Sequence, residues 1–282
     1  MYFDNQSRIV EQSLLEDIGS GDITTQSLID ESLKGKAKIY FKEDGILSGI
    51  EIAQLVFQTL DDEILFKSFF QDGDKINSKQ IIAEINGKIS TILKGERTAL
   101  NFLQRMCGIA TLTNQFVEII KNYPAKITDT RKTVPQLRLF DKLAVKHGRG
   151  INHRFGLDDM VLIKDNHIAI CGSVSNAIEK CVKYLSKINL KLKIEVEVKS
   201  ISEVYEALKY KNEIDRIMLD NFSISEMEKA VEIISNQVEV EASGNVSLEN
   251  VNEIANTKVD FISIGKLTHS VKAIDISLEI DV

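Results

Sequence analysis

The sequence predicts an α/β protein, with an N-terminal mixed α+β domain followed by a barrel-like domain of six strand–helix units. Strand-like and helix-like segments are mixed over roughly the first hundred residues, as in α+β domains. After Pro124, short apolar runs alternate with segments of helical spacing. That alternation indicates a parallel sheet with crossover helices, and six units are fewer than the eight of the common α/β barrel.

The N-terminal elements follow from hydrophobic spacing and turn residues. The turn Gly19-Ser20-Gly21-Asp22 is interpreted as a loop, because no strand precedes it and no helix clearly follows it. Gly108 lies inside a long helical pattern, which it could kink or divide. The expected elements are helices at 7–16, 49–60 and 94–121 and strands at 36–42 and 64–70.

The second half contains six runs with the length and β-branched content of buried parallel strands. Segments with apolar residues at helical spacing separate them. The expected strands are 126–130, 160–164, 194–198, 216–220, 238–242 and 261–265, and the clearest intervening helices are 175–186, 202–210 and 225–235.

Composition excludes several classes of protein. The chain of 282 residues carries a formal net charge of −7, which argues against nucleic acid as a partner. No apolar run reaches the roughly 18 residues of a membrane span, and the N-terminus lacks a signal-peptide pattern. Three cysteines without metal-binding spacing are expected to be reduced thiols. We therefore expect a cytoplasmic enzyme or binding protein.

This acidic protein nevertheless gathers cations between residues 127 and 167, which indicates an anionic ligand. Three of its four histidines (His147, His153 and His167) fall in this stretch. A guanidinium recognises a carboxylate through two hydrogen bonds, so several arginines with a histidine suggest a substrate with more than one carboxylate. His153 alone could equally be structural. The cations are Arg131, Lys132, Arg138, Lys142, Lys146, Arg149, Arg154 and Lys164.

The carboxyl ends of the six predicted strands are all polar, and in parallel α/β barrels the active site lies there. Gly244 and Gly265 follow the last two strands, where backbone N–H groups can approach a phosphate, although ordinary loop closure is the other reading. The ends read Thr130-Arg131-Lys132, Lys164-Asp165-Asn166-His167, Glu195-Val196-Glu197, Asp220-Asn221, Ser243-Gly244-Asn245 and Ser263-Ile264-Gly265-Lys266.

Carboxylates also occur at these ends. Glu195 and Glu197 alternate with Val196, so both glutamates face the same side of their strand, and Asp220 ends an apolar run. Carboxylates beside a phosphate site suit a reaction that develops positive charge on a sugar, or a cation that bridges phosphates. By pattern alone, Arg97 is interpreted as a surface charge.

These segments together resemble the quinolinate phosphoribosyltransferase family, also called nicotinate-nucleotide pyrophosphorylase (carboxylating). The resemblance covers nearly the whole chain and rests on many motifs in one order. They are Glu16-Asp17 to Thr24-Thr25, Glu96-Arg97-Thr98-Ala99-Leu100-Asn101, Gly108-Ile109-Ala110-Thr111, Thr130-Arg131-Lys132-Thr133, Asn152-His153-Arg154, Lys164-Asp165-Asn166-His167, Glu195-Val196-Glu197, Leu219-Asp220-Asn221-Phe222, Glu241-Ala242-Ser243-Gly244 and Leu267-Thr268-His269-Ser270.

The resemblance implies an N-terminal α/β domain, residues 1–107 joined by 269–282, and a six-stranded open α/β barrel, residues 108–268. It implies conversion of quinolinate and phosphoribosyl pyrophosphate to nicotinate mononucleotide, pyrophosphate and carbon dioxide in NAD biosynthesis. Magnesium is expected as the cofactor, carried by pyrophosphate near Glu197 and Asp220, with no direct ligand assigned. A homodimer with a shared active site is expected, and further assembly to a hexamer is left open.

The resemblance also assigns residues. Lys132, Glu197 and Asp220 are the expected catalytic residues. The residues expected to bind quinolinate are Arg97 (from the neighbouring subunit, which reverses the surface reading), Thr130, Arg131, His153, Arg154 and Lys164. The residues expected to hold the phosphoribosyl group are Lys132, Glu197, Asp220, Ser243, Gly244, Asn245, Ser263, Ile264 and Gly265.

Two positions depart from the family pattern: Arg149 stands where glycine is usual, and Lys266 where alanine is common. Three other functions are alternatives for a chain of this pattern. A molybdenum-transport-associated paralogue would not need the full cation set, and a nicotinate phosphoribosyltransferase binds only a monocarboxylate. A non-catalytic phosphosugar-binding barrel would not need Glu197 and Asp220.

Overall fold

The structure, a computed structural model, describes residues 2–281, with side chains from Asn5 onward. Met1 and Val282, the ends of the predicted N-terminal domain, lie outside this range. The described chain forms two compact units. The first contains the residues up to Asn114, Thr133–Arg149 and the residues from Leu267 onward; the second contains Gln115–Lys132 and Gly150–Lys266. The predicted domains kept residues 108–268 together, whereas this division assigns Thr133–Arg149 to the first unit.

The first unit is built on an antiparallel sheet with the strand order β12-β1-β5-β3. The C-terminal strand β12 pairs with β1 along six residues, which joins the end of the chain to this unit. Side chains of β1 alternate between buried and more exposed positions, as expected for a sheet with one face on the core. The strands are β1 (Lys34–Phe41), β3 (Leu65–Ser68), β5 (Ile81–Lys88) and β12 (Ile276–Asp281), with a small ribbon of β2 (Gly45–Ile46) and β4 (Lys75–Ile76).

The predicted helices at 7–16, 49–60 and 94–121 are all present. The turn at residues 19–22 is a loop, as interpreted, but a short helix does follow it: Asp22 caps this helix by accepting a hydrogen bond from the Thr25 backbone N–H. Gly108 does not break its helix; a side chain there would collide with the Lys272 carbonyl oxygen. The helices of this unit are α1 (Tyr2–Ile18), α2 (Ile23–Leu28), α3 (Ile50–Leu60), α5 (Arg138–His147) and most of α4 (Ile89–Ile119).

A buried ion pair fixes α5 within the first unit. Arg105 on α4 donates two hydrogen bonds, each of 2.8 Å, to the carboxylate of Asp141, which is fully buried. The same guanidinium donates a third bond of 3.0 Å to the carbonyl oxygen of Thr268, in the short helix α11 (Lys266–His269). Sequence periodicity did not predict α5, whose placement depends on this pair.

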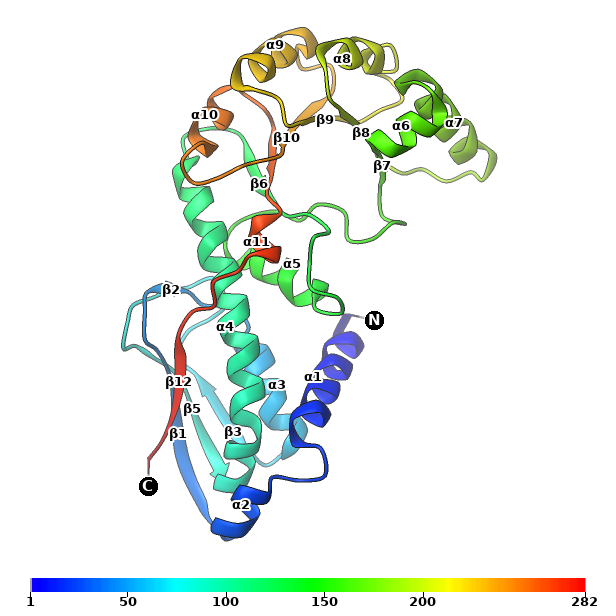
Figure 1. Cartoon of the computed structure of the whole chain (residues 1–282). Helices are drawn as coiled ribbons and strands as arrows, with labels where there is room; N and C mark the ends of the chain where they lie inside the picture. The colour runs from blue at the N-terminus through cyan, green and yellow to red at the C-terminus, as the bar shows by residue number, and fades with distance from the viewer. Residues whose placement is uncertain (1, 282) are drawn as a thin grey trace. The chain divides into compact units, whose positions relative to one another are not determined.

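The second unit contains six parallel strands in the order β6-β11-β10-β9-β8-β7 (Figure 1). Within residues 2–281, β6 and β7 do not pair with each other, so the barrel is open between them, as predicted. An isolated bridge between Thr128 and Ile151 borders β6 at this opening. The strands are β6 (Lys126–Thr128), β7 (Val161–Ile163), β8 (Ile194–Val198), β9 (Arg216–Asp220), β10 (Glu239–Ser243) and β11 (Phe261–Ser263).

Helices follow the strands and line the outer side of the curved sheet (Figure 1). Alternate strand residues such as Val196, Val198 and Ile217 are fully buried and apolar, as parallel sheets covered by helices require. Residues that alternate with them, such as Glu195 and Glu197, carry charge. The helices are α6 (Asp165–Cys171), α7 (Val174–Lys187), α8 (Ile201–Leu208), α9 (Ile224–Ile234) and α10 (Val251–Asn256).

Two expectations from composition concern the whole chain. Among the described residues, no helix combines the length and apolar character needed to cross a bilayer. The three cysteines are free thiols: Cys107 is buried, and Cys171 and Cys181 are half-buried. That these thiols are reduced in the protein stays a prediction from the sequence.

We predict that Asp141→Ala lowers the free energy of unfolding by about 3 kcal/mol, because it leaves the Arg105 guanidinium without its carboxylate. Urea denaturation measures the loss. The matched control is Lys36→Ala, which removes the exposed 3.6 Å pair with Glu84 and should cost less than about 1 kcal/mol. Equal losses in the two variants would contradict the anchoring role of Asp141.

Candidate active site

The candidate site lies at the carboxyl ends of the six strands of the second unit. Because the strands are parallel, their carboxyl ends share one edge of the sheet. Arg97 is the only proposed site residue outside this unit; it is exposed on α4, in the first unit. Those that the second unit brings to its edge are Thr130, Arg131, Lys132, His153, Arg154, Lys164, Glu197, Asp220, Ser243, Gly244, Asn245, Ser263, Ile264 and Gly265.

Two arginines at this edge, Arg131 and Arg154, lie close enough for their charges to interact. Arg154 is only 9% exposed and donates a 2.9 Å hydrogen bond to the Met160 carbonyl oxygen. Burial lowers the pKa of Arg154, the charge of Arg131 lowers it further, and Glu195 opposes both. The Nε of Arg131 is buried without a hydrogen-bond partner among the described residues. Two close cations, one with an unsatisfied buried donor, fit an anionic group placed between them.

Asp129 explains why the segment carrying Arg154 lies beside β6. Its carboxylate is fully buried and accepts hydrogen bonds from the Asn152 side-chain amide at 2.6 Å and from the His153 backbone N–H at 2.8 Å. The chain re-enters the second unit at Gly150, so these bonds fix the returning segment. The sequence analysis did not single out Asp129; a charged residue between two threonines at a strand end was the available signal.

His153 has both ring nitrogens directed at protein groups. Nδ1 accepts a 2.8 Å hydrogen bond from the Arg154 backbone N–H. Nε2 lies 2.9 Å from Glu195 Oε2 and 3.6 Å from Glu241 Oε1, and the side chain is 5% exposed. A contact between His153 and the substrate, expected from the family resemblance, stays a prediction; the structure directs the ring nitrogens to Arg154 and the two glutamates.

A buried charged cluster therefore fills the barrel beneath the arginines. Burial raises the pKa of Glu195 to about 7, against the opposing charge of Arg216. Burial and then the charge of Glu195 raise the pKa of Glu241 to about 7. Arg216 Nη1 lies 2.7 Å from Glu241 Oε2, and its guanidinium stacks 3.7 Å from the ring centre of Phe261. Charged residues within apolar strand runs were the sequence signal for this cluster.

Carboxylates and a lysine surround the outer part of the site. Burial raises the pKa of Glu197, and the neighbouring charge of Asp220 raises it further, while Lys164 opposes the shift. Glu197 and Asp220 are therefore close enough to interact, from adjacent strands β8 and β9. Lys164 is exposed, and its backbone N–H donates to His167 Nδ1 at 2.9 Å, which caps α6.

The Thr130–Lys132 segment has its own local structure. The Lys132 backbone N–H donates a 3.1 Å hydrogen bond to Thr130 Oγ1, and the Lys132 side chain is exposed. Thr130 thus shapes the turn that carries both cations, Arg131 and Lys132, out of β6.

The loop after β10 requires its glycine. Gly244 has a φ of +98°, and a Cβ there would collide with the side-chain oxygen of Asn221. Asn245 donates a 3.0 Å hydrogen bond to the same oxygen, and the Asn221 backbone N–H donates to the Ser243 carbonyl oxygen at 2.9 Å. These contacts tie the ends of β9 and β10 together, so Asp220 and Ser243 belong to one rigid edge.

The loop after β11 is less open than predicted from its small residues. Ser263 and Ile264 are both buried, and the Ile264 backbone N–H donates to the Thr128 carbonyl oxygen at 3.0 Å. That N–H is used within the sheet. Gly265 is half-buried and remains the more accessible part of the turn.

The two departures from the family pattern are exposed side chains. Arg149 adopts a φ of +69°, which explains why glycine suits this position. Lys266 begins α11, where its charge lowers the pKa of Glu249 after the larger effect of hydrogen bonds at Ser247 and the Glu249 backbone.

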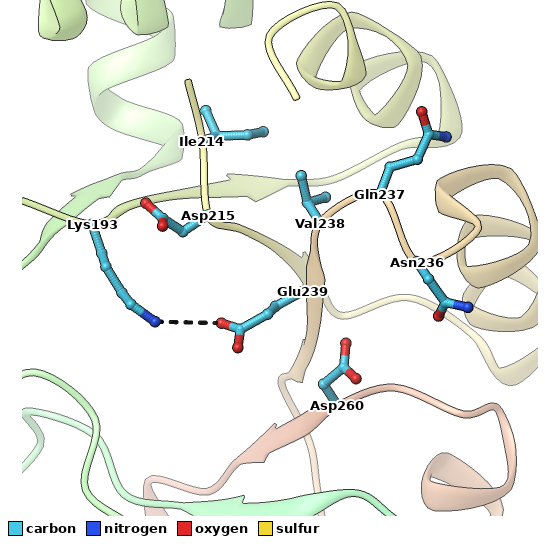
Figure 2. A pocket seen from close by; sticks show the side chains of 8 residues that line it. All are labelled: Lys193, Ile214, Asp215, Asn236, Gln237, Val238, Glu239 and Asp260. Atoms are coloured by element: carbon cyan, nitrogen blue, oxygen red, sulfur yellow. Dashed lines mark ion pairs between the residues drawn. The ribbon is translucent and has the colours of Figure 1, made fainter. Parts of the chain in front are cut away.

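A pocket at the opposite, amino ends of the strands offers a contrast (Figure 2). Two of its acids are already used to support neighbouring strands: Asp215 accepts the Ile194 backbone N–H and Asp260 accepts that of Val240, each at 2.8 Å. Figure 2 also shows the Lys193–Glu239 ion pair, which is 4.0 Å long. Acidic residues of this pocket therefore support the strands, and Lys193 is the one cation among the described residues that line it.

Comparison with known proteins identifies the family. The family model described as "Quinolinate phosphoribosyl transferase, N-terminal domain" matches residues 22–107, and the corresponding C-terminal domain model matches residues 109–279. A quinolinate phosphoribosyltransferase (decarboxylating) of Nicotiana tabacum is 45% identical over 97% of this chain and 81% of its own length. A probable nicotinate-nucleotide pyrophosphorylase (carboxylating) of Bacillus subtilis is 39% identical over 97% and 92%, respectively.

A solved structure agrees with these sequence matches. The nicotinate-nucleotide pyrophosphorylase of Francisella tularensis superimposes with a TM-score of 0.91 at 41% identity, covering 99% of this chain and 96% of that one. Two adjoining family models and close relatives along almost the entire length leave one conclusion: the chain belongs to the quinolinate phosphoribosyltransferase family.

Proposed function

We propose that this protein transfers the phosphoribosyl group of phosphoribosyl pyrophosphate to quinolinate and releases nicotinate mononucleotide, pyrophosphate and carbon dioxide, a step of NAD biosynthesis. The names of its relatives support this reaction. The observation that carries it is the buried Arg131 Nε, without an acceptor among the described residues and close to the buried Arg154, at the same sheet edge that bears Glu197 and Asp220. The cations match a dicarboxylate, and the acids match a sugar that becomes positively charged.

On the quinolinate side, the side chains of Arg131, Arg154 and Lys164 would bind the two carboxylates. The buried Nε of Arg131 would gain an acceptor, and the repulsion between Arg131 and Arg154 would be offset by the dianion. Thr130 shapes the turn that presents Arg131. Substrate binding would thus orient the ring nitrogen toward the second substrate. Holding the two reacting atoms in this geometry lowers the barrier to their reaction.

On the phosphoribosyl side, Lys132 and the two loops after β10 and β11 would hold phosphate groups. Gly244 and Gly265 provide backbone at close approach, with Ser243, Asn245, Ser263 and Ile264 shaping the loops. The carboxylate oxygens of Glu197 and Asp220 are hard ligands that suit magnesium, and such an ion, brought by pyrophosphate, would offset the charge of the leaving group.

The chemistry proceeds in two steps. The ring nitrogen forms a bond to the anomeric carbon of the ribose as its bond to pyrophosphate breaks, and Glu197 and Asp220 stabilise the positive charge on the sugar. The ring, now cationic, accepts the electron pair left when the adjacent carboxylate departs as carbon dioxide. The ring carbon then takes up a proton. No covalent intermediate with the protein is required.

We further propose a homodimer in which Arg97 of one subunit reaches the site of its partner. This arrangement is also compatible with a hexamer built from such dimers. The exposure of Arg97 supports this role, because its guanidinium is accessible to a second chain. A cytoplasmic location stays a prediction from the sequence.

The overall reaction is tested by incubating the purified protein with quinolinate, phosphoribosyl pyrophosphate and magnesium and measuring nicotinate mononucleotide and carbon dioxide. Formation of both in equal amounts is expected. Binding of phosphoribosyl pyrophosphate without product would instead identify a non-catalytic phosphosugar-binding barrel.

We predict that Arg131→Ala and Lys164→Ala each reduce kcat/KM for quinolinate by about a thousandfold, because each leaves a substrate carboxylate without its partner in a desolvated site. Steady-state kinetics and circular dichroism measure activity and folding. Lys193→Ala, at the amino ends of the strands, is the matched loss of one cation and should retain activity. Wild-type-like turnover by either site variant would refute the assignment.

We predict that Arg97→Ala and Glu197→Ala proteins, each nearly inactive alone, regain activity when mixed. In a hybrid dimer one site has both residues intact, so random mixing should restore roughly a quarter of wild-type activity if the dimer is closed and symmetric. Subunit exchange is followed by native mass spectrometry. Complete exchange without recovered turnover would show that the site is not shared.

A further inference from the structure

We propose that Glu195 and Glu241, buried inside the barrel and away from the substrates, are positioning residues that hold His153 and through it Arg154 in the quinolinate site. The proposal rests on the proposed function and adds to it two residues that the family motifs did not assign to the site. In this proposal, His153 connects the buried acids to the substrate-binding segment.

The hydrogen bond at His153 Nδ1 indicates which tautomer the imidazole adopts. Nδ1 accepts the Arg154 backbone N–H at 2.8 Å, so it carries a lone pair rather than a proton. A neutral imidazole then has its proton on Nε2, the nitrogen that faces Glu195 Oε2 at 2.9 Å and Glu241 Oε1 at 3.6 Å. The acids thus stabilise the tautomer that accepts from Arg154.

The acids are enclosed inside the barrel, which restricts their side chains as a positioning role requires. Both are fully buried on inward-facing positions of β8 and β10. Arg216 Nη1 contacts Glu241 Oε2 at 2.7 Å, and Phe261 stacks against that guanidinium. Glu195 Oε2 lies 2.9 Å from His153 Nε2, and the charges of Arg216 and Arg154 also act on this carboxylate.

The same three side chains bring possible metal-ligand atoms within 4.8 Å of one another, and a metal is therefore the competing reading. The geometry disfavours it. A metal-bound histidine normally donates its second ring N–H, whereas Nδ1 of His153 accepts a hydrogen bond and has no proton to donate. One glutamate is moreover already paired with Arg216.

The decisive comparison is between Glu195→Gln or Glu241→Gln and Glu239→Gln. Glu239 is the matched control, because it lies on β10 and bonds the same Arg216 at 3.0 Å but borders the pocket of Figure 2 rather than His153. We expect the KM for quinolinate to rise about ten- to a hundredfold in the first two variants. The KM for phosphoribosyl pyrophosphate should change less than about twofold in all three.

A purely structural role predicts a different pattern: lower thermal stability and a smaller active fraction, with no selective change in the quinolinate KM. A double-mutant cycle adds a second criterion. If Glu195 acts through the imidazole, adding Glu195→Gln to a His153→Asn protein should change the quinolinate KM little further. Fully additive effects of the two substitutions would overturn the proposal.

Histidine NMR tests the arrangement without any turnover. In protein labelled with ¹⁵N-histidine, His153 should show the Nε2–H tautomer, with a change of its ¹⁵N shifts in Glu195→Gln but not in Glu239→Gln. The Nδ1–H tautomer, or one equivalent of bound metal lost from Glu195→Gln, would overturn the proposal. Absence of turnover in the wild type with the expected NMR result would refute the proposed reaction and leave the positioning intact.

Discussion

The desolvation of charge inside the barrel is the constraint on which the rest of the site depends. Glu195, Glu241 and Arg216 occupy inward positions that most small barrels fill with apolar side chains. Isolated charges in such a place are costly, so each must lie against a complementary group. Ion-pair distances join Arg216 to Glu241 and both glutamates to His153, so the charges of the interior bear on where His153 lies.

That constraint extends to the substrate-binding edge through short, specific contacts. His153 links the interior to the Arg154 backbone, and Asp129 holds the same segment from the end of β6. Arg131 leaves β6 two residues beyond Asp129, so the two arginines are supported from one side by a strand and from the other by the buried cluster. The charges of Arg131 and Arg154 repel each other, and this support opposes their separation.

The segment Thr133–Arg149 of the first unit interrupts the second unit in the sequence. The chain leaves the second unit just after Arg131 and Lys132 and returns just before Asn152 and His153. In between, α5 is held within the first unit by the bidentate Arg105–Asp141 pair. In the sequence, both the point of departure and the point of return therefore adjoin proposed substrate-binding segments.

The sequence by itself determined the architecture and most of the site edge. Strand–helix alternation and residue spacing are local properties, and in a parallel sheet the carboxyl ends must share an edge, so Arg131, Lys164, Glu197 and Asp220 could be grouped without coordinates. The tertiary structure alone decided which charges are buried together. It turned Glu195, Glu241 and Arg216 into one cluster, directed His153 toward it and assigned α5 to the first unit, because burial depends on packing between distant segments that no local pattern records.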